Sequence, residues 1–204
     1  MRIIAGRAGG LRLDVPKIGV RPTMDRVKAA IFSSLGQSIL GARVLDLFAG
    51  SGSLGIEALS RGAGSAVFVE QDRQSVSTIE KNLQKSKLIG QVRQQDVFEF
   101  LESARRLTAL SSQGSRDVSR AFDIIFADPP YDQTKSGERF TDKLLTNENL
   151  PKLIEPGGTF VLEKRPEEKL PETDFWEVVR RKTYGATEVL FLSAIRNPRS
   201  TIQK

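Results

Sequence analysis

The spacing of apolar positions changes along the chain and predicts a small hairpin followed by a larger α/β unit. Two short stretches, 2–5 and 11–15, carry alternating apolar residues on either side of a glycine-containing turn, which predicts a β-hairpin. Apolar positions then follow a helical spacing over about 24–35. Thr23 stands directly before this segment, where a side-chain oxygen caps a helix.

From residue 43 onward, short buried runs alternate with helical segments. Strands are expected at 44–48, 65–69, 92–95, 122–127 and 159–163, helices at about 55–59, 74–86, 97–109 and 138–154, and a closing antiparallel pair at 175–182 and 187–195. Such alternation predicts an α/β fold, with a parallel sheet covered by helices on both faces. We therefore expect an N-terminal hairpin extension, 1–22, and one main domain, 23–204.

Chemically useful residues follow the predicted strands directly. In an open parallel sheet, ligands bind at the carboxyl ends of the strands, near the point where the strand order reverses. The segments at these ends are 46–52, Glu70, Asp96 and 128–131. We expect them to share one site.

The first of these segments is a glycine loop between a strand and a helix. Gly50, Gly52 and Gly55 satisfy the spacing G-x-G-x-x-G, which suits a nicotinamide cofactor as well as S-adenosylmethionine. Asp46 favours S-adenosylmethionine, because a carboxylate suits a cationic methionine group better than a pyrophosphate. Glu70 is placed to hold ribose hydroxyls. The residues expected at the cofactor are Asp46, Phe48, Ala49, Gly50, Ser51, Gly52, Glu70, Gln71, Asp96, Val97 and Asp128.

Asp96 has two compatible interpretations. Its carboxylate could accept a hydrogen bond from the cofactor's adenine amine, with help from the Val97 backbone. It could equally cap the helix that starts there.

Two consecutive prolines follow the predicted strand 122–127. Proline supplies no N–H and fixes its own φ, so Pro129 and Pro130 form a rigid corner that presents Asp128 and Tyr131. An exocyclic base amine is a poor nucleophile and needs acceptors that aim its nitrogen. The Asp128 carboxylate and the Pro129 carbonyl can accept these hydrogen bonds, while Tyr131 stacks on a base that has left its stack. We expect these four residues to be catalytic in methyl transfer to such an amine.

Composition excludes several other chemistries. The 204-residue chain contains no cysteine and no histidine, so thiolate zinc sites, cysteine nucleophiles and histidine bases are ruled out. A cytosine-C5 methyltransferase, which needs a thiolate, is ruled out with them. We expect no metal. No segment is apolar enough for a membrane span or signal peptide, which predicts a cytoplasmic protein, with a monomer as the default.

The net charge of +6 is concentrated at the two ends of the chain. The first forty residues hold seven basic and two acidic residues, which favours a polyanionic partner.

The chain resembles the RsmD-type methyltransferases, which modify the N2 amine of a guanine in bacterial 16S ribosomal RNA. The matching segments are 2–6, 21–23, 25–27, 45–52, 57–62, 70–72, 128–131 and 184–185. The resemblance implies a class I (Rossmann-like) methyltransferase fold, with a seven-stranded, mostly parallel sheet and a small N-terminal β-hairpin. It also implies the cofactor S-adenosylmethionine, and an assembled or partly assembled small ribosomal subunit as substrate. The loop 111–120 looks longer than this family's pattern.

The N-terminal basic residues then acquire an expected role, which is to contact RNA phosphates. The residues assigned to RNA are Arg2, Arg7, Arg12, Lys17, Arg21, Thr23 and Arg26. Three alternatives remain open at this point. An N6-adenine DNA or RNA methyltransferase shares the chemistry, a NAD-dependent oxidoreductase shares the glycine loop, and a ribosome-assembly protein could keep the fold without activity.

Overall fold

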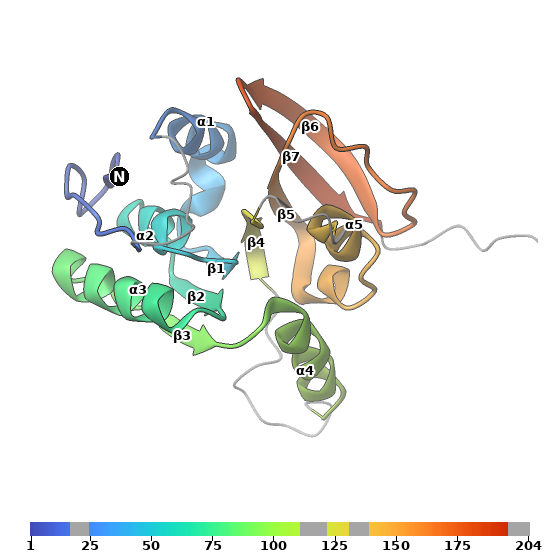
Figure 1. Ribbon diagram of the computed structural model, residues 1–204, viewed down its shortest axis with the longest axis horizontal. Helices are drawn as coiled ribbons and strands as arrows, with labels where there is room; N and C mark the ends of the chain where they lie inside the picture. Colours follow the sequence, from blue (N-terminus) through green and yellow to red (C-terminus); the bar gives the residue numbers. More distant parts are fainter. Residues whose placement is uncertain (17–24, 111–121, 131–138, 196–204) are drawn as a thin grey trace, which may run out of the picture.

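A seven-stranded sheet in the order β3-β2-β1-β4-β5-β7-β6 forms the centre of the protein (Figure 1). The computed structural model describes residues 1–16, 25–110, 122–130 and 139–195. The strands are β1 (Arg43–Leu47), β2 (Ser65–Glu70), β3 (Gln91–Gln94), β4 (Phe122–Ala127), β5 (Ile154–Lys164), β6 (Trp176–Tyr184) and β7 (Thr187–Ala194). Strands β1 to β5 pair in parallel, whereas β7 pairs antiparallel with β5 and with β6. The predicted mostly parallel sheet is confirmed.

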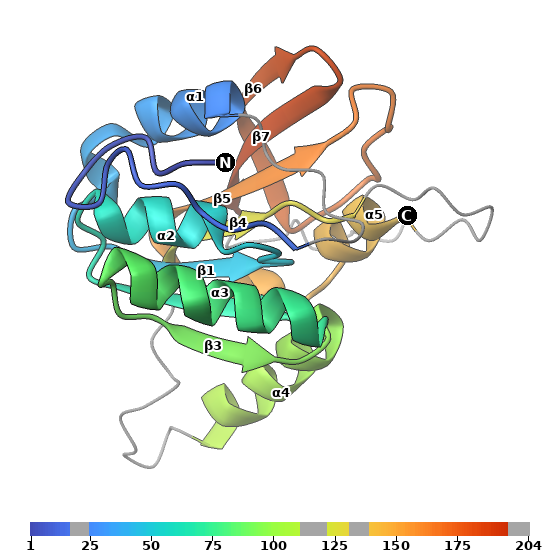
Figure 2. The same cartoon turned by 60° about the vertical axis from the view of Figure 1, so that its left-hand side comes forward.

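Helices cover both faces of this sheet, and each face has its own apolar core. Helices α1 (Asp25–Leu35), α2 (Ser53–Ser60) and α3 (Arg73–Ser86) lie on one face, and α4 (Val97–Leu110) and α5 (Phe140–Leu145) on the other (Figures 1 and 2). Phe68 and Phe126 are buried on the first face, and Ile125 and Leu101 on the second. This layering is what the alternation of strands and helices predicts.

The expected helix over 138–154 is wrong over most of its length. Helix α5 ends at Leu145, a 3-10 turn covers Leu150–Leu153, and β5 already starts at Ile154. The side chain of Asn147 explains the break, because its Oδ1 accepts the backbone N–H groups of Asn149 (2.9 Å) and Leu150 (3.0 Å). A polar side chain that binds nearby N–H groups in this way competes with the helix.

The N-terminal segment pairs with itself as a hairpin, but without regular strands. Arg2 and Arg12 form an isolated antiparallel bridge, and the Ile3 N–H donates to the Leu11 carbonyl at 2.9 Å. The next two N–H groups, of Ile4 and Ala5, turn away and donate to the carboxylate of Glu57. The expected strands at 2–5 and 11–15 are therefore reduced to one bridge. The proposed boundary near residue 22 lies outside the described residues.

The strand order reverses between β1 and β4, and the register there brings acidic residues together. Asp46 on β1 lies opposite Phe126 on β4, and Ala127 on β4 lies opposite Leu162 on β5. One step further, Asp128 and Glu163 stand side by side at the carboxyl ends of their strands. The fold therefore assembles three carboxylates at its switch point, where α/β proteins bind ligands.

Candidate active site

The glycine loop after β1 needs backbone conformations that only glycine adopts easily. Gly50 and Gly52 have φ values of 55° and 75°, and Phe48, which is not a glycine, has φ 56°. Left-handed backbone at a non-glycine residue is uncommon and is often found at functional sites. Gly52 directly precedes α2, which starts at Ser53. A ligand at the carboxyl end of β1 would therefore lie close to the backbone of this loop.

Glu70 holds this loop in place from the end of β2. Its Oε2 accepts the Gly50 N–H at 2.8 Å, and its Oε1 accepts the Asp72 N–H at 2.8 Å. Each carboxylate oxygen has a second lone pair, so Glu70 can still accept ribose hydroxyls as expected from the sequence. Gln71 beside it is exposed, whereas Ala49 and Ser51 in the loop are buried.

Asp46 lies beneath the loop and is only 2% exposed. Its Oδ2 accepts the Gly55 N–H at 2.8 Å, which ties β1 to the first turn of α2. Burial raises the pKa of Asp46 to about 8, against the opposing effect of the Gly55 N–H and with added repulsion from Asp128 and Glu70. A cationic ligand would favour the ionised form of Asp46, whereas the negative charge of a pyrophosphate would be repelled by that carboxylate. The site therefore suits S-adenosylmethionine better than a nicotinamide cofactor.

Asp96 caps helix α4, which is one of its two expected roles. Its Oδ1 accepts the N–H groups of Phe98 at 2.8 Å and Glu99 at 3.1 Å. Val97 is buried behind it. The second expected role, an adenine contact, stays a prediction.

Three aromatic rings gather beside the loop, and the sequence analysis missed two of them. Phe48 lies edge-on to Phe98 at 6.2 Å and to Phe140 at 5.6 Å between ring centroids, and Phe98 stacks on Phe140 at 6.2 Å. They come from the end of β1, the first turn of α4 and the start of α5, so only the fold brings them together. They make an apolar wall at the mouth of the site.

The proline corner opens onto a cavity with an accessible volume of about 390 Å³. Pro129 is buried, whereas Asp128 is half-buried and Pro130 is exposed. The residues that line the cavity are Pro129, Pro130, Arg139, Phe140, Thr141, Glu163, Lys164, Arg165, Glu167 and Glu168. Its volume and mixed lining are within the range of small-molecule sites and leave room for a nucleobase. Tyr131 lies outside the described residues, and its stacking role stays a prediction.

Glu163 is the acidic residue of this cavity that sequence reasoning missed. It is 3% exposed, and its Oε1 has no hydrogen-bond partner among the described residues. Burial, followed by repulsion from Asp128 and Asp46, raises its pKa well above the usual value. Lys164, next along β5, is also buried and pairs with Glu188 at 2.8 Å, on the other side of the strand.

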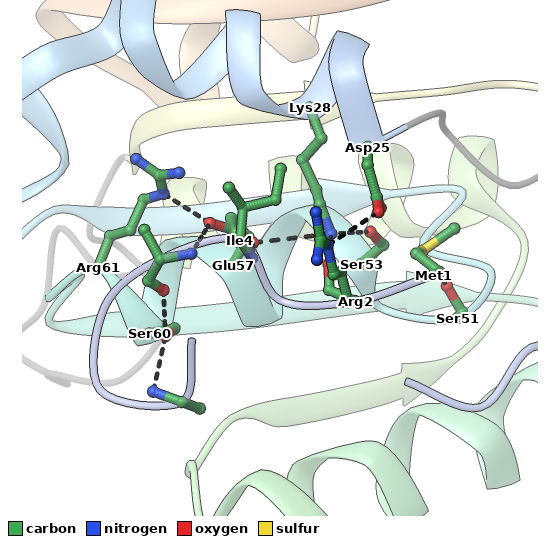
Figure 3. Close-up of polar contacts among 12 residues, drawn as sticks. Met1, Arg2, Ile4, Asp25, Lys28, Ser51, Ser53, Glu57, Ser60 and Arg61 are labelled. Carbon is green, nitrogen blue, oxygen red and sulfur yellow. Dashed lines mark hydrogen bonds and ion pairs between the residues drawn. The ribbon is translucent and has the colours of Figure 1, made fainter. Parts of the chain in front are cut away.

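The N-terminal segment is fixed to the site through buried polar contacts (Figure 3). Lys28 on α1 and Glu57 on α2 are both fully buried, 3.6 Å apart. The Lys28 ammonium donates to the Arg2 carbonyl at 2.6 Å and to Ser53 Oγ at 3.0 Å. Glu57 accepts the Ile4 N–H at 2.7 Å. The segment thereby crosses the outer side of α2, between α1 and α3 (Figure 2).

Asn82 on α3 links this segment directly to the glycine loop. Its Nδ2 donates to the carbonyls of Ser51 and Asp14, each at 3.0 Å, and its Oδ1 accepts the Asp14 N–H at 2.8 Å. Met1 also reaches the loop, with its Sδ 3.5 Å from Ser51 Oγ. The basic extension and the cofactor loop therefore form one continuous structure.

The structure places the described arginines that were predicted to contact RNA on the surface of the protein. Arg2, Arg7, Arg12 and Arg26 are exposed. Arg2 also pairs with Asp25 at 3.3 Å. The remaining predicted RNA contacts, Lys17, Arg21 and Thr23, lie outside the described residues. No helix within the described part of the chain is long and apolar enough to cross a membrane.

The protonation of Asp46 predicts a pH-dependent stability of the cofactor-free protein. Its folded pKa is raised to about 8 from an unfolded value near 3.8, so folding favours the protonated form. Stability is therefore highest below about pH 4 for this group and is lost as the pH rises through about 8. Asp46→Asn should raise the melting temperature at pH 8 by about 5 °C, and this difference should shrink steadily as the pH falls toward about 4.

Differential scanning fluorimetry across this pH range measures the effect, and the exposed Asp174→Asn is the matched control. Glu163 titrates in the same direction, so the Asp46 variant should retain part of the slope. An Asp46→Asn protein that melts like the wild type at every pH would contradict the assignment. S-adenosylmethionine should stabilise the wild type most at high pH, where the carboxylates are ionised.

The sheet order, the glycine loop and the switch-point carboxylates define a class I S-adenosylmethionine-dependent methyltransferase. Residues 1–193 match the model of the family described as conserved hypothetical protein 95. The chain belongs to this family, the RsmD family of methyltransferases. The expected family and cofactor are confirmed, and the oxidoreductase alternative is not supported.

Named relatives and solved structures agree with this assignment. YlbH of Bacillus subtilis, named as an rRNA methyltransferase, is 40% identical over 93% of this chain and 96% of its own. The ribosomal RNA small subunit methyltransferase D of Haemophilus influenzae is 33% identical over 91% of this chain and 89% of its own. A hypothetical protein of Thermus thermophilus superposes with a TM-score of 0.75, at 30% identity, over 95% of this chain and 99% of its own.

A further solved structure is a more distant neighbour with a bound nucleoside. The 16S rRNA N2 methyltransferase RsmC of Thermus thermophilus was solved in complex with AdoMet and guanosine. It superposes with a TM-score of 0.58 at 26% identity, over 87% of this chain and 44% of its own.

Proposed function

We propose that this protein transfers a methyl group from S-adenosylmethionine to the N2 amine of a guanine in bacterial 16S rRNA, within an assembled or partly assembled small subunit. The observation that carries the proposal is the corner at Asp128 and Pro129, which opens onto a cavity whose lining residue Phe140 packs against Phe48 of the glycine loop. The names of the relatives supply the rRNA, and the neighbour solved with guanosine supports the base.

The residues of this corner have the chemistry that such a reaction needs. The bound cofactor supplies an electrophilic methyl group. The target amine keeps its lone pair in the ring, so hydrogen bonds to the Asp128 carboxylate and the Pro129 carbonyl hold its nitrogen in line with that methyl group. Both acceptors sit on a strand end that the prolines keep rigid. The aromatic wall of Phe48, Phe98 and Phe140 limits water at the reacting centre.

The exposed arginines of the N-terminal segment are proposed to grip the RNA backbone. Arg7 and Arg12 are exposed on a segment that is bound to α2 and, through Asn82, to the glycine loop. RNA held by these arginines would therefore sit at a fixed position relative to the cofactor. Neutralising phosphates with such side chains releases counterions, which makes binding steeply salt-dependent.

The decisive experiment for the function is quantitative mass spectrometry of methylated nucleosides in 16S rRNA, from cells with and without the gene. N2-methylguanosine should fall by one residue per small subunit when the gene is absent, and the purified protein should restore it on undermethylated subunits. Unchanged N2-methylguanosine together with lost N6-methyladenine in RNA or DNA would replace this proposal with the adenine alternative. Unchanged levels of both would favour an assembly protein without activity.

Reversing the charges of Arg7 and Arg12 tests the proposed contact with the RNA backbone separately. The double change Arg7→Glu and Arg12→Glu should weaken binding to small subunits at least about tenfold at low salt, and it should flatten the salt dependence by about two counterions. Filter binding over a salt series measures both quantities. Arg73→Glu, an exposed arginine of α3, is the matched control. Equal affinities and equal salt slopes in the double variant and the wild type would show that Arg7 and Arg12 do not bind the RNA backbone.

A further inference from the structure

We propose that Glu163 reads the Watson–Crick edge of the target guanine, by accepting a hydrogen bond from the N1–H of the base. This inference rests on the proposed function and deepens it, because it names the residue that selects the base.

The position of Glu163 is the first argument. The β4–β5 register places it on β5 beside Asp128, which stands at the end of β4 where the proline corner begins. It lines the same cavity as Pro129 and Pro130. In guanine, N1–H is the ring position next to the carbon that carries the N2 amine. A base whose N2 is held by Asp128 and the Pro129 carbonyl therefore turns its N1–H toward the neighbouring strand, which carries Glu163.

The carboxyl group of Glu163 is also incompletely hydrogen-bonded. Glu163 is 3% exposed, and its Oε1 has no hydrogen-bond partner among the residues that the structure describes. A buried polar atom without a partner costs about 1–3 kcal/mol. Lys164, the adjacent buried charge on β5, instead donates to two carbonyls and pairs with Glu188. Lys164 therefore has partners for its ammonium group, whereas Glu163 keeps an acceptor oxygen available at the cavity. This arrangement is expected where a bound ligand supplies the missing hydrogen bond.

The chemistry of the group matches guanine in either protonation state. An ionised carboxylate accepts the N1–H. The neutral acid, which the raised pKa of Glu163 favours before ligands bind, accepts the N1–H with its carbonyl oxygen and donates its own hydrogen to O6. A glutamine side chain has the same acceptor and donor pattern as the neutral acid. An alanine has neither, and it leaves a space about the size of the lost carboxyl group.

The test uses the full-length protein saturated with S-adenosylhomocysteine, titrated with guanosine and with 1-methylguanosine by calorimetry. The wild type should bind guanosine at least about tenfold more tightly, because 1-methylguanosine lacks the N1–H and places a methyl group against Glu163. In Glu163→Ala this ratio should fall to about one, since guanosine loses its partner and the methyl group enters the emptied space. Glu163→Gln should keep the ratio within about threefold of the wild type.

A purely structural role for Glu163 would not change this ratio, and the exposed Glu177→Ala on β6 serves as the control. An unchanged ratio in Glu163→Ala overturns the inference, as does a wild type that binds no guanosine at millimolar concentration. Weakened S-adenosylmethionine binding with an unchanged ratio would assign Glu163 to the cofactor instead. The rRNA mass spectrometry fails or succeeds independently, so an error in the proposed substrate is distinguishable from an error about Glu163.

Discussion

Replacing Asp128 with alanine should lower the rate of methyl transfer about a thousandfold, while the protein stays folded and still binds S-adenosylmethionine. The half-buried carboxylate stands at the end of β4, between Asp46 on one side and Glu163 on the other. We assign it the acceptor that aims the base amine, and losing one preorganised polar partner of a transition state costs about a hundredfold to a thousandfold in rate. A single-turnover assay on undermethylated small subunits measures this step.

Two companion measurements separate this catalytic role from a structural one. Asp128→Asn keeps an acceptor oxygen at the same place, so it should retain clearly more activity than the alanine variant. Asp128 repels both Asp46 and Glu163, and its removal should lower the pKa of each. Cofactor affinity, measured by calorimetry, should consequently change far less than the rate. An alanine variant with wild-type turnover would remove Asp128 from the mechanism.

The sequence predicted those parts of the site whose residues are adjacent along the chain. The glycine loop and the proline corner each follow a buried apolar run directly, so strand, turn and polar residue are visible together. Glu70 was placed correctly after its strand, but its bond to the Gly50 N–H depends on β1 and β2 lying in parallel. The mostly parallel sheet likewise follows from the alternation of strands and helices, and its seven strands from the family resemblance.

The parts that the sequence missed depend on contacts between distant segments. Glu163 and Lys164 look alike as two charges at the end of an apolar strand. Both line the cavity, and only the fold shows that Lys164 pairs with Glu188 while Oε1 of Glu163 has no partner among the described residues. The Phe98 and Phe140 rings belong to different helices and meet only in the fold. The helix expected through residue 154 failed because Asn147 captures two backbone N–H groups, which apolar spacing does not reveal.

The ion pair of Lys28 and Glu57 is another contact between separate segments that the sequence did not predict. Breaking this pair should have the largest effect on stability. Both side chains are fully buried, and burial lowers the pKa of Lys28 although Glu57 opposes this shift. Glu57 also receives the N–H groups of Ile4 and Ala5, and the Arg61 Nε at 2.6 Å. One carboxylate therefore compensates a buried ammonium and holds the N-terminal segment on α2.

Glu57→Gln should lower the free energy of unfolding by about 3 kcal/mol, because it leaves the Lys28 charge buried without its counter-charge. Urea denaturation followed by circular dichroism measures this, and the exposed Glu80→Gln on α3 should change stability by less than about 0.5 kcal/mol. Adding Lys28→Met to Glu57→Gln should recover most of the loss, since the remaining amide still accepts an N–H while no charge stays buried. If the double variant were as unstable as the sum of its single variants, the two side chains would not be coupled, and Glu57 would act only as an acceptor for the N-terminal backbone.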